Sequence, residues 1–194
     1  MDSATVLITG YARQLTNGRW YATSTTVLVR SSGKLVLVDP GCKPEELTAA
    51  LQQEGLAIGD IDLVVNTHSH YDHTRNSRLI AKERVLNLYQ TAPKQQPEPW
   101  FVPGTDISVV HTPGHVDKHI ALLVETRDGA CAIAGDVFWW QDDEVQETDT
   151  KGLKEHPDPV GKNQPQLEKS RIKLLKLADY IIPGHGKPFS VPGK

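Results

Sequence analysis

Three histidines and an aspartate lie within six residues, in the segment His68-Ser69-His70-Tyr71-Asp72-His73. Neutral imidazole and carboxylate are ligands that divalent zinc accepts. In an extended segment His68 and His70 point the same way, because side chains alternate along a strand, so the two can bind one metal together. If the chain then turns into a helix, Asp72 and His73 point to a second position nearby. The spacing therefore predicts a metal site with two neighbouring positions.

Four ligands do not fill two metal positions, so we expect partners from elsewhere in the chain. Three candidates sit in Gly or Pro turns after apolar, strand-like runs, and they are His115, Asp136 and His185. Glycine and proline at such turns let backbone segments approach closely. A single histidine is more often a hydrogen-bonded core or surface residue, but the clustering of residue types favours metal ligands here.

The elements that must position these residues can be read from the apolar pattern. Residues 61–66 predict a buried strand that ends at the histidine cluster, and residues 74–81 predict a helix after it. In α/β sheets, ligands bind at such strand ends. Asp39 ends another strand, and it is either a turn-forming residue or a carboxylate that orients a ligand histidine. Further strands are predicted at 6–9, 25–29, 35–38, 85–88, 107–110, 120–124, 130–134 and 181–182, helices at 44–54 and 167–178, and loops at 91–104 and 139–163.

The order of these elements runs from strands to strand–helix units and then repeats, which predicts two sheets packed face to face with helices outside. At 194 residues, with no internal repeat or linker, we expect one domain over residues 1–194. The net charge of −3 does not favour broad, nonspecific binding of long nucleic acid. No membrane span or secretory leader is visible, so we expect a cytoplasmic location, with the nucleus as the alternative. Cys42 and Cys131 are expected to be reduced thiols.

Five segments, in the same order along the chain, resemble motifs of the metallo-β-lactamase superfamily. They are residues 37–41, 68–73, 112–115, 135–136 and 183–186. The resemblance covers essentially the whole chain and implies an α+β fold, the four-layer αββα sandwich of metallo-β-lactamases. It implies that His68, His70 and His115 bind a first metal. It also implies that Asp72, His73 and His185 bind a second metal and that Asp136 bridges the two. The implied cofactor is two divalent ions, with zinc expected first and manganese or iron as alternatives.

A narrower resemblance concerns the second half of the chain. Residues 134–138, 170–171 and 182–189 resemble the family of metallo-β-lactamase domain-containing protein 1, described as a ribonuclease acting on histone pre-messenger RNA. This implies an endoribonuclease in which hydroxide shared by the metals attacks a phosphodiester of single-stranded RNA. Asp72 is then a candidate proton acceptor. His119 is a candidate donor to the leaving group, or else a strand-start residue facing solvent.

Two other substrate classes stay open at this point. Residues 115–119 look more like glyoxalase II and related hydrolases, which favours a small-molecule thioester, lactone or β-lactam substrate. A persulfide dioxygenase shares the fold and the motif, and it would hold one iron on His68, His115 and Asp136. A homodimer is also open. Four aromatic residues are candidates for stacking on a base or an acyl group, and they are Trp100, Phe101, Trp139 and Trp140.

Overall fold

The structure is a computed structural model that describes residues 1–91 and 100–194. Most of its strands form two five-stranded sheets. The first has the order β1-β4-β5-β6-β7, and its strands are β1 (Ser3–Ile8), β4 (Thr26–Ser31), β5 (Lys34–Val38), β6 (Leu63–Val65) and β7 (Val85–Leu86). Its last three strands run parallel, and the other pairs are antiparallel.

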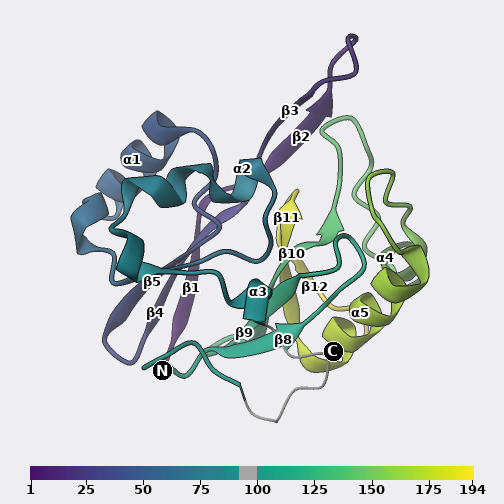
Figure 1. The fold of residues 1–194 in the computed structure, drawn as a ribbon. Helices are drawn as coiled ribbons and strands as arrows, with labels where there is room; N and C mark the ends of the chain where they lie inside the picture. Colours follow the sequence, from purple (N-terminus) through teal and green to yellow (C-terminus); the bar gives the residue numbers. More distant parts are fainter. Residues whose placement is uncertain (92–99) are drawn as a thin grey trace.

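The second sheet has the order β12-β11-β10-β9-β8. Its strands are β8 (Ser108–His111), β9 (Ile120–Thr126), β10 (Gly129–Trp139), β11 (Tyr180–His185) and β12 (Phe189–Ser190). Only β10 and β11 run parallel. Outside both sheets, β2 (Tyr11–Gln14) and β3 (Trp20–Thr23) form a hairpin that projects from the body (Figure 1).

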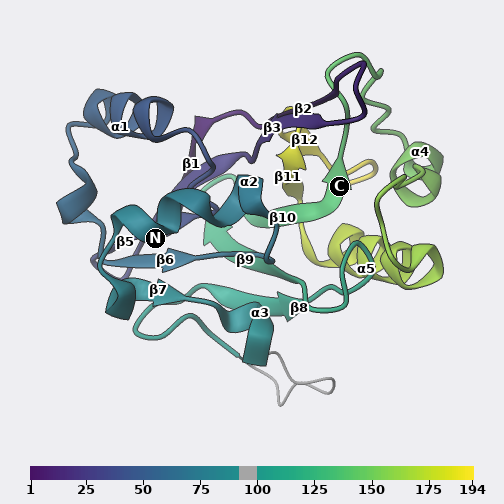
Figure 2. The ribbon, with the colours of Figure 1, turned by 45° about the horizontal axis from the view of Figure 1, so that its top comes forward.

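Helices cover the outer faces of the two sheets (Figure 2). The first sheet carries α1 (Pro44–Gln53) and α2 (Tyr71–Thr74), and α3 (Leu88–Thr91) follows β7. The second sheet carries α4 (Thr150–Glu155) and α5 (Gln164–Leu177). Short 3-10 turns span Ile58–Asp60, Arg75–Leu79 and Lys82–Arg84. In the described part of the chain, no helix combines the length and the apolar character that crossing a bilayer requires.

Alternation along the strands builds three apolar interfaces. In β4, Val27 and Val29 pack between the sheets, whereas Leu28 faces α1. A second cluster joins Leu47 and Leu51 of α1 to this outer face, and a third packs the helices α4 and α5 on the second sheet. Three interfaces separate four layers, so the expected α+β sandwich of αββα type is confirmed.

Several predicted elements differ from those in the structure. The helix predicted at 74–81 begins earlier, at Tyr71, and continues only as the 3-10 turn Arg75–Leu79. The strand predicted at 130–134 runs on to Trp139, because β11 pairs with it as far as Trp139 and residues 130–139 are all buried. Asp136 therefore lies inside a strand, not in a turn after one. The loop predicted at 139–163 contains α4, and the loop predicted at 91–104 falls largely outside the described residues.

A fully buried arginine ties α5 to the second sheet. The Arg171 side chain donates from Nε to the carbonyl of Val137 at 2.9 Å. Its Nη1 donates to the carbonyls of Lys154 at 3.2 Å and His156 at 2.5 Å. Burial lowers the pKa of Arg171 to about 10, so the guanidinium stays charged at neutral pH. These contacts fix the backbone beside Asp136 and the segment that follows α4.

Replacing this arginine should destabilise the fold. Arg171→Met keeps an apolar chain of similar length but leaves one buried and two partly buried carbonyls without their charged donor. We expect the free energy of unfolding to fall by about 3 kcal/mol, measured by urea denaturation. The matched control is Lys169→Met, an exposed position on the same helix, which should change it by less than about 0.5 kcal/mol. Equal stability of the two variants would contradict this account.

Candidate metal centre

Seven side chains from distant parts of the sequence meet where the ends of strands from both sheets come together. His68 and His70 follow β6, and Asp72 and His73 lie on α2. The other three come from the second sheet, where His115 follows β8, Asp136 lies in β10 and His185 ends β11. The potential ligand atoms form two groups, each within 4.8 Å, made of His68, His70, His115 and Asp136 and of Asp72, His73 and His185. All seven predicted residues are therefore brought together.

Asp136 lies between the two groups and presents one oxygen to each. Its Oδ2 is 3.3 Å from Nε2 of His115 and 3.6 Å from Nε2 of His68. Its Oδ1 is 3.1 Å from Nε2 of His73 and 3.6 Å from Nε2 of His185. The side chain is nearly buried, at 6% exposure. This is the arrangement expected of a carboxylate that bridges two cations.

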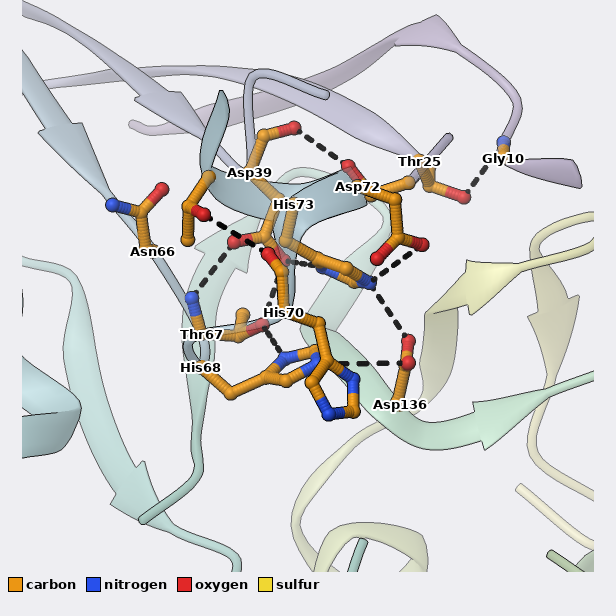
Figure 3. A network of polar contacts seen from close by, with 12 residues as sticks. Gly10, Thr25, Asp39, Asn66, Thr67, His68, His70, Asp72, His73 and Asp136 are labelled. Atoms are coloured by element: carbon orange, nitrogen blue, oxygen red, sulfur yellow. Dashed lines mark hydrogen bonds and ion pairs between the residues drawn. The ribbon is translucent and has the colours of Figure 1, made fainter. Parts of the chain in front are cut away.

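A buried network at the ends of β5 and β6 orients two of the histidines (Figure 3). The Asp39 carboxylate contacts Nδ1 of His73 at 2.8 Å and accepts from the amide and hydroxyl of Thr67, both at 2.7 Å. Because the Thr67 hydroxyl donates to Asp39, it accepts from Nδ1 of His68 at 3.0 Å. Of the two roles that the sequence allowed for Asp39, the structure supports the carboxylate that orients a histidine.

The histidines of the second sheet have outer partners of their own. The Nδ1 of His115 contacts Oδ2 of the buried Asp158 at 2.7 Å, and Nδ1 of His185 lies 3.1 Å from the carbonyl of Tyr11. Sequence reasoning missed Asp158. Its only signal was its place between two prolines in a long polar segment, and that did not indicate which histidine it would reach.

Two of the inner nitrogens point into the cluster without hydrogen bonds, whereas Nε2 of His115 lies 3.1 Å from Nδ1 of His70. Within the described residues, Nε2 of His68, Nε2 of His73 and Oδ1 of Asp136 are buried and make none. Buried polar atoms are almost always satisfied, so each such exception needs a reason. Lone pairs on imidazole nitrogens that face a shared carboxylate fit a divalent metal, and the donor set suits zinc.

Neighbouring charges oppose the effect of burial on the pKa of His73 and of Asp136. Burial alone would lower the pKa of His73, but the carboxylates of Asp136, Asp39 and Asp72 raise it well above 6.5. Burial would likewise raise the pKa of Asp136, yet the neighbouring histidines, His73 first, hold it well below 3.8. For His68, burial and the charge of His73 both lower the pKa, so this ring is neutral with a free lone pair.

Two glycines next to the cluster are required by close packing. A Cβ at Gly184 would lie 1.9 Å from Oδ1 of Asp136, so a side chain at this position would displace the carboxylate. Gly135 has a φ of +50°, and its Cβ would lie 2.6 Å from the Thr67 hydroxyl. The strand register shifts at Gly135, and such a bulge re-aims the side chain that follows it. These contacts explain why glycine precedes both Asp136 and His185.

His119 does not occupy the position predicted for a catalytic donor. Its ring is fully buried and stacks on His68 with centroids 4.9 Å apart and an interplanar angle of 27°. Its Nδ1 lies 2.9 Å from the Thr112 hydroxyl, and it does not line the cavity at the metal centre. His119 therefore faces neither the cavity nor solvent, because the start of β9 turns it beneath the cluster. This geometry gives no support to the predicted donation to a leaving group.

A cavity of about 540 Å³ opens over the cluster. Asp72 and Tyr71 line it, whereas of the four aromatic candidates only Trp139 does. Trp100 packs against the core between the sheets, and Trp140 is buried under the second sheet. Two further aromatics on the wall come from the β2–β3 hairpin, Trp20 and Tyr21. Their polar flanks gave no periodic signal that would have placed them at the site.

Comparison with known proteins agrees with this geometry. Residues 19–94 match the family described as the metallo-beta-lactamase superfamily. Metallo-beta-lactamase domain-containing protein 1 from Xenopus laevis is 34% identical over 202 residues, which cover 97% of this chain and 82% of that protein. The protein of the same name from Rattus norvegicus is longer, and the match to it covers 63% of its length at 35% identity.

Solved structures share the fold. The crystal structure of a Thermotoga maritima protein named for the metallo-beta-lactamases superposes with a TM-score of 0.71 at 21% identity, covering 97% of this chain and 99% of that one. TTHA1623, crystallised in a di-iron-bound form, gives a TM-score of 0.57 at 24% identity over 87% of this chain and 90% of that one. Sequence match and fold therefore place the chain in the metallo-β-lactamase superfamily of metal-dependent hydrolases, with metallo-beta-lactamase domain-containing protein 1 among its relatives.

Proposed function

We propose that this chain hydrolyses a phosphodiester of single-stranded RNA with two divalent ions bound in the seven-residue cluster. The observation that carries the proposal is the placement of Asp136, which offers one carboxylate oxygen to each group of ligands. His68, His70 and His115 would hold the first ion, and Asp72, His73 and His185 the second. Five imidazoles and two carboxylates favour zinc over magnesium or calcium, which prefer oxygen ligands.

Divalent ions bound in such a site supply a nucleophile at neutral pH, because they lower the pKa of water from 15.7 to about 7. The side chains of the cavity supply the acid–base chemistry. Asp72 lines the cavity. Burial raises its pKa, but His73 and His185 lower it by more, so the net effect is a pKa below 3.8. Asp72 is therefore ionised at neutral pH and placed to accept a proton.

The choice of RNA rests on the relatives and on the cavity wall. The resemblance to metallo-beta-lactamase domain-containing protein 1 implies a ribonuclease, and exposed aromatic rings beside the metal centre suit base stacking. A small thioester or lactone is the second candidate, because a volume of about 540 Å³ lies within the range of small-molecule sites.

Turnover of short single-stranded RNA should be compared with turnover of thioester, lactone and β-lactam substrates. Activity on the small esters alone would end the RNA proposal.

Metal analysis separates hydrolysis from the oxygenase alternative. Elemental analysis of protein purified without added metal should give about two zinc or manganese ions per chain. A single iron per chain would instead favour a dioxygenase centred on His68, His115 and Asp136. The convergence of Asp72, His73 and His185 as a second group supports the dinuclear reading.

Removing the shared carboxylate should disable both metal positions. Asp136→Ala is expected to lower the metal content to one ion or fewer per chain and to reduce turnover by at least about 100-fold. The control is Asp128→Ala, which removes an exposed carboxylate from the turn between β9 and β10. Elemental analysis and initial rates on the same samples provide the measurement. Unaltered turnover in Asp136→Ala would refute the bridging role.

The outer carboxylates should tune the two positions separately. Asp158→Asn removes the partner of His115 and should weaken metal binding at the first position by about 10- to 100-fold. Asp39→Asn removes a carboxylate that contacts His73 directly and reaches His68 only through the Thr67 hydroxyl, so it should weaken binding mainly at the second position by a similar factor. Competition with a chromogenic zinc chelator measures both affinities. Loss of the same ion in both variants would show that the two groups do not act as separate positions.

A further inference from the structure

Three cationic side chains near the cavity lie on aromatic rings instead of pairing with carboxylates. The Lys43 ammonium is 4.4 Å from the centroid of the Tyr21 ring, and the guanidinium carbon of Arg13 is 5.7 Å from the same centroid. The guanidinium carbon of Arg75 is 4.9 Å from the centroid of Tyr71. Within residues 1–91 and 100–194, none of the three cations forms an ion pair. Their charges are therefore not neutralised by a neighbouring acid group in direct contact.

These five residues form one strip along a wall of the cavity, which we call the cation–aromatic strip. Tyr21, Lys43 and Tyr71 line the cavity directly. The end of the hairpin is joined to α2, because the amide of Ser24 donates to the carbonyl of Asp72 at 3.1 Å. The hairpin and α2 consequently lie side by side in both ribbon views (Figures 1 and 2). Arg13 lies on the Tyr21 ring and Arg75 on the Tyr71 ring, so both cations flank the cavity that opens over the metal centre.

The rings of the strip are unusually exposed for side chains of their type. Tyr71 is 60% exposed and Tyr21 is 40% exposed, and Trp20 next to them is 38% exposed. All three rings line the same cavity, and aromatic side chains gathered around one cavity are typical of binding sites. Tyr21 also stacks on Tyr11 with ring centroids 5.5 Å apart, so the platform is held in place.

We propose that the cation–aromatic strip is the track along which a single-stranded polynucleotide reaches the metal centre. Phosphates would contact Arg13, Lys43 and Arg75, and bases would stack on the exposed rings. Proteins that bind single strands combine a positive groove with aromatic platforms in this way. A small neutral ester carries no negative charge that would pair with the three cations. A duplex keeps its bases stacked inside the helix, so they cannot stack on the exposed rings. The inference rests on the proposed phosphodiester hydrolysis and assigns the residues that would select the substrate.

Binding and turnover should be measured separately. Binding is followed by fluorescence anisotropy of the metal-loaded chain with a phosphorothioate oligouridylate, which resists cleavage. Replacing the three cations together, as Arg13→Gln, Lys43→Gln and Arg75→Gln, should weaken binding by at least about tenfold. It should also reduce the slope of log K against log salt by about 2, since each phosphate contact on a single strand contributes about 0.7. The control replaces three exposed cations away from the strip by Gln, and they are Arg127, Lys169 and Lys176.

Two single variants test the stacking and the sign of the charge. Tyr71→Ala should weaken oligouridylate binding by about tenfold, whereas Tyr71→Phe keeps the ring and should retain affinity. Glu46 accepts from the Tyr11 hydroxyl at 3.4 Å, so its negative charge lies beside the strip. Glu46→Gln should therefore tighten binding, and the effect should fade at high salt.

The results test polynucleotide binding by the strip separately from phosphodiester hydrolysis at the metal centre. Wild-type turnover of bis(p-nitrophenyl) phosphate reports on hydrolysis alone. If that substrate is cleaved while the triple strip variant and its control bind oligouridylate equally, the strip assignment is overturned and the hydrolysis stands. If binding depends on the strip but bis(p-nitrophenyl) phosphate is not cleaved, the strip is supported and the proposed hydrolysis falls.

Discussion

A buried carboxylate that must be compensated by histidines from several strands is the constraint on which this structure depends. Asp136 is almost inaccessible to solvent, and an isolated charge in such a place is costly. Each oxygen of Asp136 lies close to an imidazole nitrogen, His73 at Oδ1 and His115 at Oδ2. His73 lies on α2 beside the first sheet, and His115 follows β8 of the second. The site can therefore exist only when the sheets are packed in register, which couples the correct fold to the formation of the metal centre.

The first sheet meets this requirement through a strained residue. Asp39 has a φ of +46°, in the left-handed region that few residues other than glycine adopt. Hydroxyls of Ser24 and Thr26 donate to its carbonyl, and its carboxylate contacts Thr67 and His73. So many polar contacts on one residue offset the strain, which is of order 1–3 kcal/mol. The result is a carboxylate aimed at the metal centre from the end of β5.

The sequence was sufficient for the features that depend on local pattern. Apolar runs predicted most strands, and the spacing of His68, His70 and Asp72 predicted two neighbouring positions because it follows from strand and helix periodicity. Features set by tertiary packing were out of reach. The extension of β10 through Asp136 depends on its pairing with β11, and the contact of Asp158 with His115 joins residues far apart in the chain. The burial of His119 beneath His68 likewise follows from packing alone.

The molecule separates the parts that do chemistry from the parts that would choose the substrate. The metal centre is built on strands and helix starts whose positions are fixed by three apolar interfaces. The β2–β3 hairpin belongs to neither sheet, and its exposed rings contribute little to those interfaces. A change in the hairpin can therefore alter the shape and charge of the cavity wall while the ligands stay in place. This is a physical route by which one fold serves several substrate classes, and it makes the hairpin the part of the chain where specificity should be sought.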